Sequence, residues 1–251
     1  MSIEVIREQL KTLKLRAAAN DLDEVLSRKK GPSEIKWLSE LLEREIDARK
    51  DNAIERRIKK ADFQERTSFE QFNWDFNKKI PREPIENLYQ MNFVKENGIV
   101  LFLGSTGTGK THLAVSFGIK AAQLGHTVFC TSVKRLTMKI KIAKERNQLD
   151  QLFKRILTSK LWILDDWGVV SMPRDISEEV FDLFDRRKRN SAMLLTSNRD
   201  VEEWPQVFSE PILANAAIDR MFEHANIVIF EGPSYRMKGR IKLKDFDNEK
   251  D

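Results

Sequence analysis

The amino-acid sequence predicts an α/β fold with a five-stranded parallel sheet between helices, preceded by a small all-helical N-terminal domain. Two patterns in the 251-residue chain support this prediction. After residue 85, short apolar runs alternate with amphipathic segments of helix length, as in parallel sheets that carry helices on both faces. Before residue 61, apolar residues recur every three or four positions, which is the period of one helix face.

Composition limits the class of protein. Charged residues make up 33% of the chain and hydrophobic residues 41%, which suits a soluble protein with one main core. The longest apolar run, Ile99–Leu103, is far shorter than the roughly 18 residues of a membrane helix, and no signal-peptide pattern is present. Cys130 has no partner for an internal disulfide, and three scattered histidines predict no zinc site. We therefore expect a cytoplasmic protein without a membrane partner.

Residues 1–61 are predicted to form the helical N-terminal domain. A first helical pattern runs from Ile3 to Leu26, and Gly31-Pro32-Ser33 interrupts it. Ser33 is a suitable N-cap for a second helix, which reaches Ile58. Its apolar stripe includes Trp37, Leu38, Leu41, Leu42 and Ile46. A packing or oligomerisation role is favoured over partner docking or DNA contact.

Residues 62–84 are predicted to be a linker, residues 85–230 the α/β core and residues 231–251 a polar tail. The linker is rich in aromatic residues, which are expected to pack against the core, although they could instead cover a nucleotide base. Five apolar runs within the core are predicted to be buried strands: 99–103, 128–130, 161–164, 193–195 and 227–230.

The strongest motif is a phosphate-binding loop between the first of these strands and a helix expected from Lys110 to about Leu124. It reads Gly104-Ser105-Thr106-Gly107-Thr108-Gly109-Lys110-Thr111. Its backbone N–H groups can surround phosphates, Lys110 can reach the β- and γ-phosphates, and the Thr111 hydroxyl can bind Mg²⁺. The glycine spacing does not fit a dinucleotide-binding Rossmann loop.

Two carboxylates follow the third predicted strand. Asp165 and Asp166 come directly after Leu161–Leu164, and in a chain with a P-loop this pattern resembles Walker B. Asp165 would hold Mg²⁺ through water, and Asp166 would act as general base on the attacking water. Glutamate is usual at the second position, so Asp166 suggests slow turnover.

Two further polar residues are weaker catalytic candidates. Asn198 follows the fourth predicted strand and could orient the attacking water, although taken alone it is better explained as a turn residue. Arg220 stands among apolar and small residues, where it could pair with a local carboxylate or reach the γ-phosphate of a neighbouring subunit.

The net charge of +5 is concentrated in one segment. Residues 134–155 hold eight basic and two acidic residues, so this segment alone carries +6. Charged runs are usually only solvated faces, but this one lies on a predicted helix starting near Val133 and favours binding to DNA phosphates. The proposed DNA-binding residues are Lys134, Arg135, Lys139, Lys141, Lys144 and Arg146.

The order of these motifs resembles that in AAA+ ATPases of the DnaC and IstB group. The resemblance rests on the P-loop, Asp165-Asp166, Thr196-Ser197-Asn198, Asp219-Arg220 and Gly232-Pro233-Ser234-Tyr235-Arg236. The N-terminal helices, Glu55-Arg56-Arg57 and Gly109-Lys110-Thr111-His112-Leu113-Ala114 look most like IstB, the ATPase helper of insertion-sequence transposases.

The resemblance implies an ATP- and Mg²⁺-dependent AAA+ ATPase that regulates transposition. Such a protein would self-assemble on duplex DNA and recruit or stimulate a transposase; a DnaC-like helicase loader is the alternative. By resemblance, His112 belongs to the nucleotide site, Arg220 is the arginine finger and Arg236 is the nearest equivalent of the second sensor arginine. Because only residues 231–251 follow the last strand, the usual helical lid is expected to be missing or vestigial.

Two other hypotheses for the function explain fewer of these sequence features. A small-molecule kinase would account for the P-loop alone. A clamp or packaging protein that binds nucleotide without hydrolysing it would leave Asp166, Asn198 and Arg220 without a role.

Overall fold

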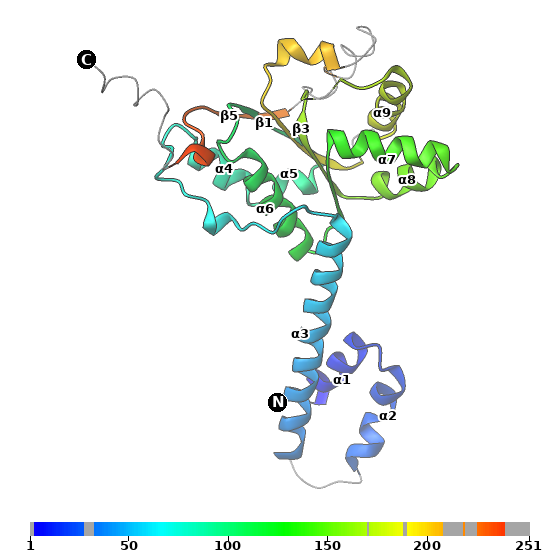
Figure 1. Cartoon of the computed structure of the whole chain (residues 1–251). Helices are drawn as coiled ribbons and strands as arrows, with labels where there is room; N and C mark the ends of the chain where they lie inside the picture. The colour runs from blue at the N-terminus through cyan, green and yellow to red at the C-terminus, as the bar shows by residue number, and fades with distance from the viewer. Residues whose placement is uncertain are drawn as a thin grey trace, which may run out of the picture. The chain divides into compact units, whose positions relative to one another are not determined.

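The computed structural model describes residues 3–27, 33–169, 171–187, 190–207, 218 and 225–238 (Figure 1). The chain divides into two compact units, Met1–Arg56 and Arg57–Asp251. The division falls within helix α3 (Ser33–Ala61), which therefore contributes residues to both units.

The N-terminal unit contains α1 (Ile3–Thr12), α2 (Arg16–Ser27) and the first part of α3. The prediction of one continuous helix from Ile3 to Leu26 is wrong, because Lys14 adopts a left-handed φ of 61°. The amide of Leu15 then bonds the carbonyl of Leu10 and closes α1. Apolar residues from all three helices, together with Leu13 in the turn after α1, form the core of this unit: Ile6, Leu10, Leu13, Ala19, Leu22 and Leu42.

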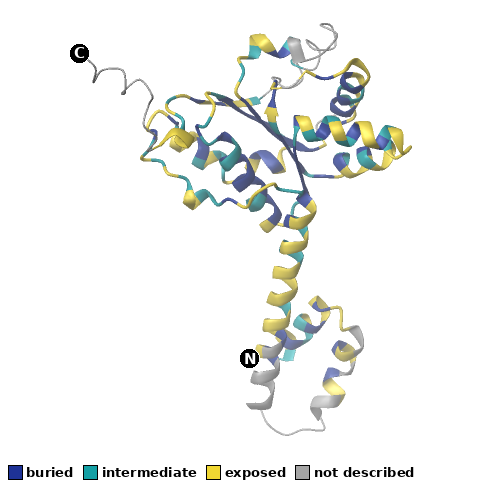
Figure 2. Cartoon of the chain, in the orientation of Figure 1, coloured by how far each residue is buried: buried dark blue, intermediate teal, exposed yellow. Residues whose placement is uncertain are grey.

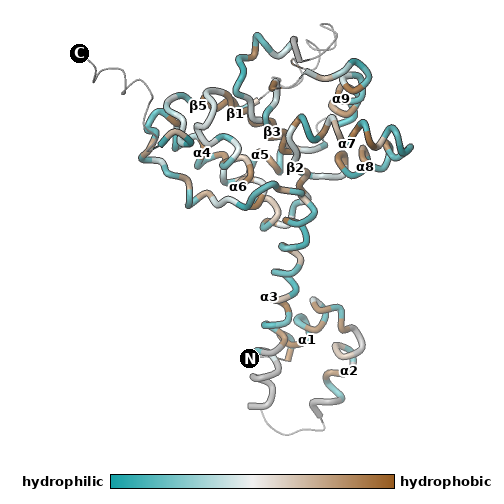
Figure 3. The backbone as a smooth tube through the Cα atoms, viewed as in Figure 1, coloured by the Kyte–Doolittle hydropathy of each residue, from teal (hydrophilic) through white to brown (hydrophobic). Residues whose placement is uncertain are grey.

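The second unit is built on a five-stranded sheet, which confirms the predicted α/β fold. Its strands lie in the order β2-β3-β4-β1-β5, and every neighbouring pair is parallel. These strands are among the most hydrophobic parts of the unit (Figure 3). Each is longer than the apolar run that predicted it: β1 (Ile99–Gly104), β2 (Val128–Ser132), β3 (Leu161–Trp167), β4 (Ala192–Ser197) and β5 (Ala225–Phe230).

Helices cover both faces of this sheet. One face packs against α6 (Lys110–Gln123), where the Phe102 and Phe117 rings meet edge to face with centroids 5.6 Å apart. The short helices α4 (Arg82–Leu88) and α5 (Asn92–Lys95) lie on the same side (Figure 1). The other face is covered by α7 (Val133–Glu145), α8 (Leu149–Leu157) and α9 (Arg174–Arg187).

The core lies between these layers. Trp162, Leu164 and Leu101 belong to the buried cluster on the α7–α9 side. Strands β1, β2 and β4 are almost continuously buried, whereas β5 at the sheet edge is largely exposed (Figure 2). Near the edges of the unit are the short 3₁₀ helices η1 (Phe69–Gln71), η2 (Val201–Val207) and η3 (Tyr235–Met237).

The aromatic linker packs against α6, as expected. The ring of Phe63 lies against Gly118, where a Cβ atom would approach that ring within 2.6 Å. Phe69 stacks on Tyr89 with ring centroids 4.1 Å apart. The Thr67 hydroxyl donates a 2.8 Å hydrogen bond to the carbonyl of His112. These contacts place the segment after Thr67 beside the P-loop.

The predicted absence of a lid stays a prediction, because residues 239–251 lie outside the described part of the chain. Within the described ranges, no helix is both long enough and apolar enough to cross a membrane.

Candidate functional site

The P-loop joins β1 directly to α6, so its glycine-rich turn lies at the carboxyl edge of the sheet. Gly107 and Gly109 have φ values of 78° and 99°, a region that glycine enters without strain. Side chains at these positions would collide with Ser234 and with the ring of Phe72. The helix starts at Lys110, so the free N–H groups of its first turn face the loop and favour an anion there.

Lys110 is held inside the loop by two backbone carbonyls. Its Nζ donates hydrogen bonds of 2.6 Å to Gly104 O and 2.7 Å to Ser105 O. Burial lowers the pKa of this ammonium group to about 8, although the charges of Asp166 and Asp165 partly oppose the shift. An incoming phosphate would place a negative charge next to this buried cation and favour its charged form.

A β-bulge in β3 places the two predicted Walker B carboxylates. Leu164 pairs with Leu195 and Trp167 pairs with Ser197, so two residues of β3 oppose the single residue Thr196 of β4. Those two residues are Asp165 and Asp166. The extra residue bends the strand and turns both carboxylates toward the P-loop edge.

Thr196 joins the two aspartates through one hydroxyl group. Its Oγ1 donates a 2.6 Å hydrogen bond to Asp165 Oδ1 and accepts one of 3.1 Å from the Asp166 amide. Asp165 Oδ1 also accepts a 2.9 Å hydrogen bond from Thr111 Oγ1 of the P-loop. This role of Thr196 was not predicted from the sequence. The signal that could have indicated it is a hydroxyl residue near the end of β4, the next strand along the chain after β3.

Thr111 and Asp165 offer the ligand chemistry that Mg²⁺ prefers. Both supply hard oxygen atoms, and Mg²⁺ is commonly held by one or two side chains together with phosphate oxygens and water. The described residues include no group of three or more His, Cys, Asp or Glu side chains that could hold a metal ion without such help. The site therefore fits a magnesium ion that arrives with a nucleotide.

Asp166 has the electrostatics of a proton acceptor. Its backbone is left-handed, with φ of 57°, as the bulge requires. Removal of water by the surrounding protein raises the pKa of its carboxyl group, and the charge of Asp165 adds to this effect. Arg236 and Lys110 partly oppose the shift.

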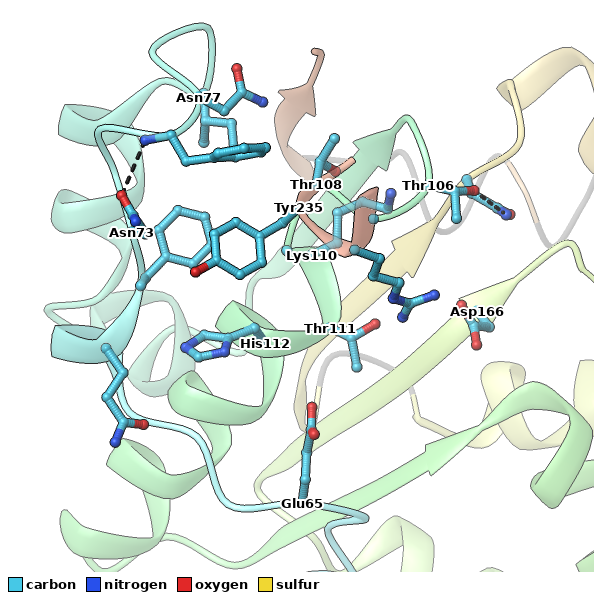
Figure 4. Close-up of a pocket in the computed structure, with 18 residues that line it drawn as sticks. Glu65, Asn73, Asn77, Thr106, Thr108, Lys110, Thr111, His112, Asp166 and Tyr235 are labelled. Atoms are coloured by element: carbon cyan, nitrogen blue, oxygen red, sulfur yellow. Dashed lines mark hydrogen bonds between the residues drawn. The ribbon is translucent and has the colours of Figure 1, made fainter. Parts of the chain in front are cut away.

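Six of the predicted P-loop residues, Thr106–Thr111, line one cavity of about 340 Å³ together with Asp166 and Asn198. Gly104 and Ser105 are not part of this lining, and their carbonyls instead hold Lys110. Figure 4 shows Lys110 and Thr111 on the P-loop side of this cavity and Asp166 at the end of β3. The Asn198 amide donates a 3.1 Å hydrogen bond to Thr106 Oγ1, so it is anchored to the loop.

The opposite wall of the cavity is aromatic and amide-rich. It is formed by Phe72, Phe76 and Asn73 of the linker and by Tyr235 of η3, whose ring meets Phe76 edge to face at 4.9 Å. Core packing was the favoured interpretation of the linker aromatics, and Phe69 follows it. Phe72 and Phe76 instead face the cavity, which is the alternative that the sequence left open.

His112, Arg236 and Arg220 differ in how the structure places them. The His112 ring lines the cavity but bonds the Ser68 carbonyl of the linker, with its Nε2 2.9 Å from that oxygen. Arg236 lines the same cavity and acts electrostatically on Asp166 and Lys110. Arg220 lies outside the described residues.

The predicted basic helix is α7, and it begins at the same edge of the sheet. Ser132 pairs with Asp165 in the sheet and caps α7 by accepting a hydrogen bond from the Arg135 amide. The six predicted DNA-binding cations divide into two sets by their partners. Arg135 and Lys139 pair with Asp62, and Lys144 pairs with Glu179 at 3.0 Å. The other three are exposed and have no hydrogen bond or ion pair among the described residues: Lys134, Lys141 and Arg146.

Comparison with known proteins agrees with this site. The family described as IstB-like ATP binding protein matches residues 8–243. A protein of insertion sequence IS232 from Bacillus thuringiensis subsp. berliner, named for ATP binding, is 33% identical over 94% of this chain and 96% of its own length. A protein of the same description from insertion sequence IS21 of Pseudomonas aeruginosa is 32% identical over 82% of this chain and 78% of its own.

The fold also resembles that of solved structures. The crystal structure of the DnaC helicase loader is similar with a TM-score of 0.51, at 19% identity over 59% of this chain and 86% of the loader chain. This likeness concerns the fold and agrees with the five-stranded parallel sheet and its flanking helices in the second unit.

Proposed function

Because this chain belongs to the family of IstB-like ATP-binding proteins, we propose that it is an ATPase that regulates DNA transposition. In this proposal it binds ATP and Mg²⁺, self-assembles on duplex DNA, and recruits or stimulates a transposase. ATP hydrolysis is the switch between its states. The observation that carries the enzymatic part is the bulge in β3, which presents Asp165 and Asp166 side by side at the P-loop.

The cavity suggests how ATP lies. The P-loop amides and Lys110 would bind the phosphates, and the wall formed by Phe72, Phe76 and Tyr235 would cover the base. Thr111 and Asp165 would hold Mg²⁺, which neutralises charge on the phosphates when it is bound. Asn73 and Tyr235 add polar groups at the base end of the cavity.

Hydrolysis needs a proton acceptor near the γ-phosphate, and Asp166 is the candidate. Its raised pKa makes it a better base than an ordinary aspartate, although its short side chain suits slow turnover. Asn198, anchored to Thr106, would orient the attacking water. Arg220 would reach the γ-phosphate of a neighbouring subunit and stabilise charge in the transition state.

The outer face of α7 is the proposed DNA interface. Lys134 and Lys141 of this helix and Arg146 at its C-cap are exposed, and they would bind phosphates without reading sequence. The other predicted cations of this helix are engaged with carboxylates of the protein. The proposed contact is thus centred on three residues rather than spread over six.

ATP hydrolysis measured with and without duplex DNA tests this function. We expect slow hydrolysis that duplex DNA stimulates, and we expect substitution of Lys134, Lys141 and Arg146 by alanine to remove the stimulation but keep the basal rate. A non-hydrolysing clamp predicts no turnover in either condition. A kinase predicts turnover that depends on a small-molecule acceptor and not on DNA.

The helicase-loader alternative rests on the fold alone. Addition of the partner transposase or of a replicative helicase to the same assay separates the two, because only the true partner should change DNA-stimulated turnover. Stimulation by the helicase and not by the transposase would favour the loader.

A further inference from the structure

Asp62 occupies the middle of a cationic cluster beside α7. It follows the last residue of α3 and adopts a left-handed φ of 66°. Its carboxylate accepts a 2.8 Å hydrogen bond from Lys139 Nζ and a 3.3 Å hydrogen bond from Arg135 Nη2. Both donors were predicted from the sequence to bind DNA phosphates.

A third cation completes this group, which we call the Asp62 cluster: Asp62, Arg135, Lys139 and Arg155. Arg155 of α8 donates a 2.9 Å hydrogen bond to the Lys60 carbonyl. The Arg155 and Lys139 side chains also lie over the ring of Phe129, at 5.8 Å and 5.2 Å from its centroid. Three positive charges therefore act on the single carboxylate of this cluster. The cluster keeps a net positive charge and can pair with a further anion.

The electrostatic balance of Asp62 agrees with this arrangement. Burial opposes ionisation, but the hydrogen bond from Lys139 and the charges of Lys139, Arg135 and Arg155 outweigh it and lower the pKa of Asp62. The carboxylate is therefore ionised at neutral pH.

An external anion can reach the cluster. The side chains of Asp62, Arg135 and Lys139 remain 37%, 38% and 23% exposed. Lys134 and Lys141 of the same helix, and Arg146 at its C-cap, are exposed and unpaired within the described chain. A duplex bound there would bring further phosphates close to Arg135 and Lys139. Arg135 and Lys139 could then pair either with Asp62 or with phosphates of the bound DNA.

We propose that Asp62 is an internal phosphate mimic, and that the backbone of bound duplex DNA displaces it from Arg135 and Lys139. The inference rests on the proposed DNA-binding function and adds an autoinhibitory contact to it. Without DNA, Asp62 masks two of the six predicted DNA-binding cations. With DNA, the end of α3 loses its ion pairs to α7.

The test is duplex binding by Asp62→Asn, measured over a range of chloride concentrations with ATP present. Each additional phosphate contact steepens the slope of log affinity against log salt by about 0.9 and tightens binding about fivefold at 0.15 M salt. We expect Asp62→Asn to bind about five- to thirtyfold more tightly than wild type, with a steeper slope. Asp150→Asn is the matched control, because it removes the same charge from neighbouring helix α8 and should change the slope little.

The cause of the gain is tested by removal of the unmasked cations. In a background with Arg135→Ala and Lys139→Ala, Asp62→Asn should give no further tightening. Equal effects of Asp62→Asn and Asp150→Asn, or a gain that persists without Arg135 and Lys139, would overturn the inference. Failure of wild type to bind duplex at all would instead overturn the proposed function.

Hydrogen exchange of the wild-type protein gives an answer that does not depend on the folding of any variant. Displacement of Asp62 predicts faster amide exchange in residues 57–63 when duplex is bound, because the end of α3 loses its anchors. Unchanged or slower exchange in this segment, with DNA bound, would contradict the displacement.

Discussion

Thr196→Val is the sharpest test of how β3 and β4 build the catalytic edge. The substitution preserves the shape of a fully buried side chain but removes the hydroxyl that bonds both Asp165 and the Asp166 amide. A hydrogen bond to a charged group contributes about 1.5 to 3 kcal/mol. If that amount is lost from the transition state, kcat for ATP hydrolysis falls by about 10- to 150-fold.

The assay is steady-state ATP hydrolysis combined with urea unfolding. We expect the free energy of unfolding of Thr196→Val to fall by about 1 to 3 kcal/mol, because the Asp166 amide loses its acceptor. Thr196→Ser is the matched control, since it keeps the hydroxyl and should keep kcat within about threefold of wild type, well inside the loss expected for valine. A valine variant with wild-type kcat, or a serine variant as slow as valine, would refute the role of this hydroxyl.

Three further substitutions separate the parts of the site. Lys110→Ala should abolish or sharply weaken ATP binding in a fluorescent-nucleotide titration, and unchanged affinity would contradict the P-loop assignment. Asp166→Asn should keep ATP bound but slow hydrolysis by about 10² to 10⁴. Because the pKa of Asp166 is raised, wild-type kcat should begin to fall, as pH is lowered, at a higher pH than an ordinary aspartate would give, and the asparagine variant should lack that limb. Arg220→Ala should bind ATP but hydrolyse it slowly, and subunits that carry Arg220 with an inactive P-loop should partly restore turnover; inactive mixtures with normal assembly would argue against a finger in trans.

The fold was largely predictable because apolar runs and a P-loop constrain an α/β chain strongly. The strand expected at residues 161–164 marked the first four residues of β3 correctly. The last three residues of β3, Asp165–Trp167, begin with two aspartates and gave no strand signal. The break at Lys14 was missed for a different reason. The apolar spacing continues across it, and only the left-handed backbone shows that α1 and α2 are separate helices.

The candidate site was predictable where a motif fixes roles along the chain. Lys110, Thr111 and Asp165 gather as expected because the P-loop and β3 end at one edge of a parallel sheet. Thr196 and Asp62 were not found, since each acts through contacts between segments distant in sequence. The pairing of Arg135 and Lys139 with Asp62 is likewise invisible in a count of local charge.

The affinity of the protein for duplex DNA, measured with ATP, with ADP and without nucleotide, tests the central claim most directly. The nucleotide site and the basic helix α7 are connected through neighbouring strands. Asp165 of the site pairs in the sheet with Ser132, which is the N-cap of α7. We therefore predict that ATP tightens duplex binding and assembly relative to ADP or no nucleotide, and that Lys110→Ala removes the difference. Equal affinities in all three nucleotide states would contradict an ATP-dependent switch on DNA.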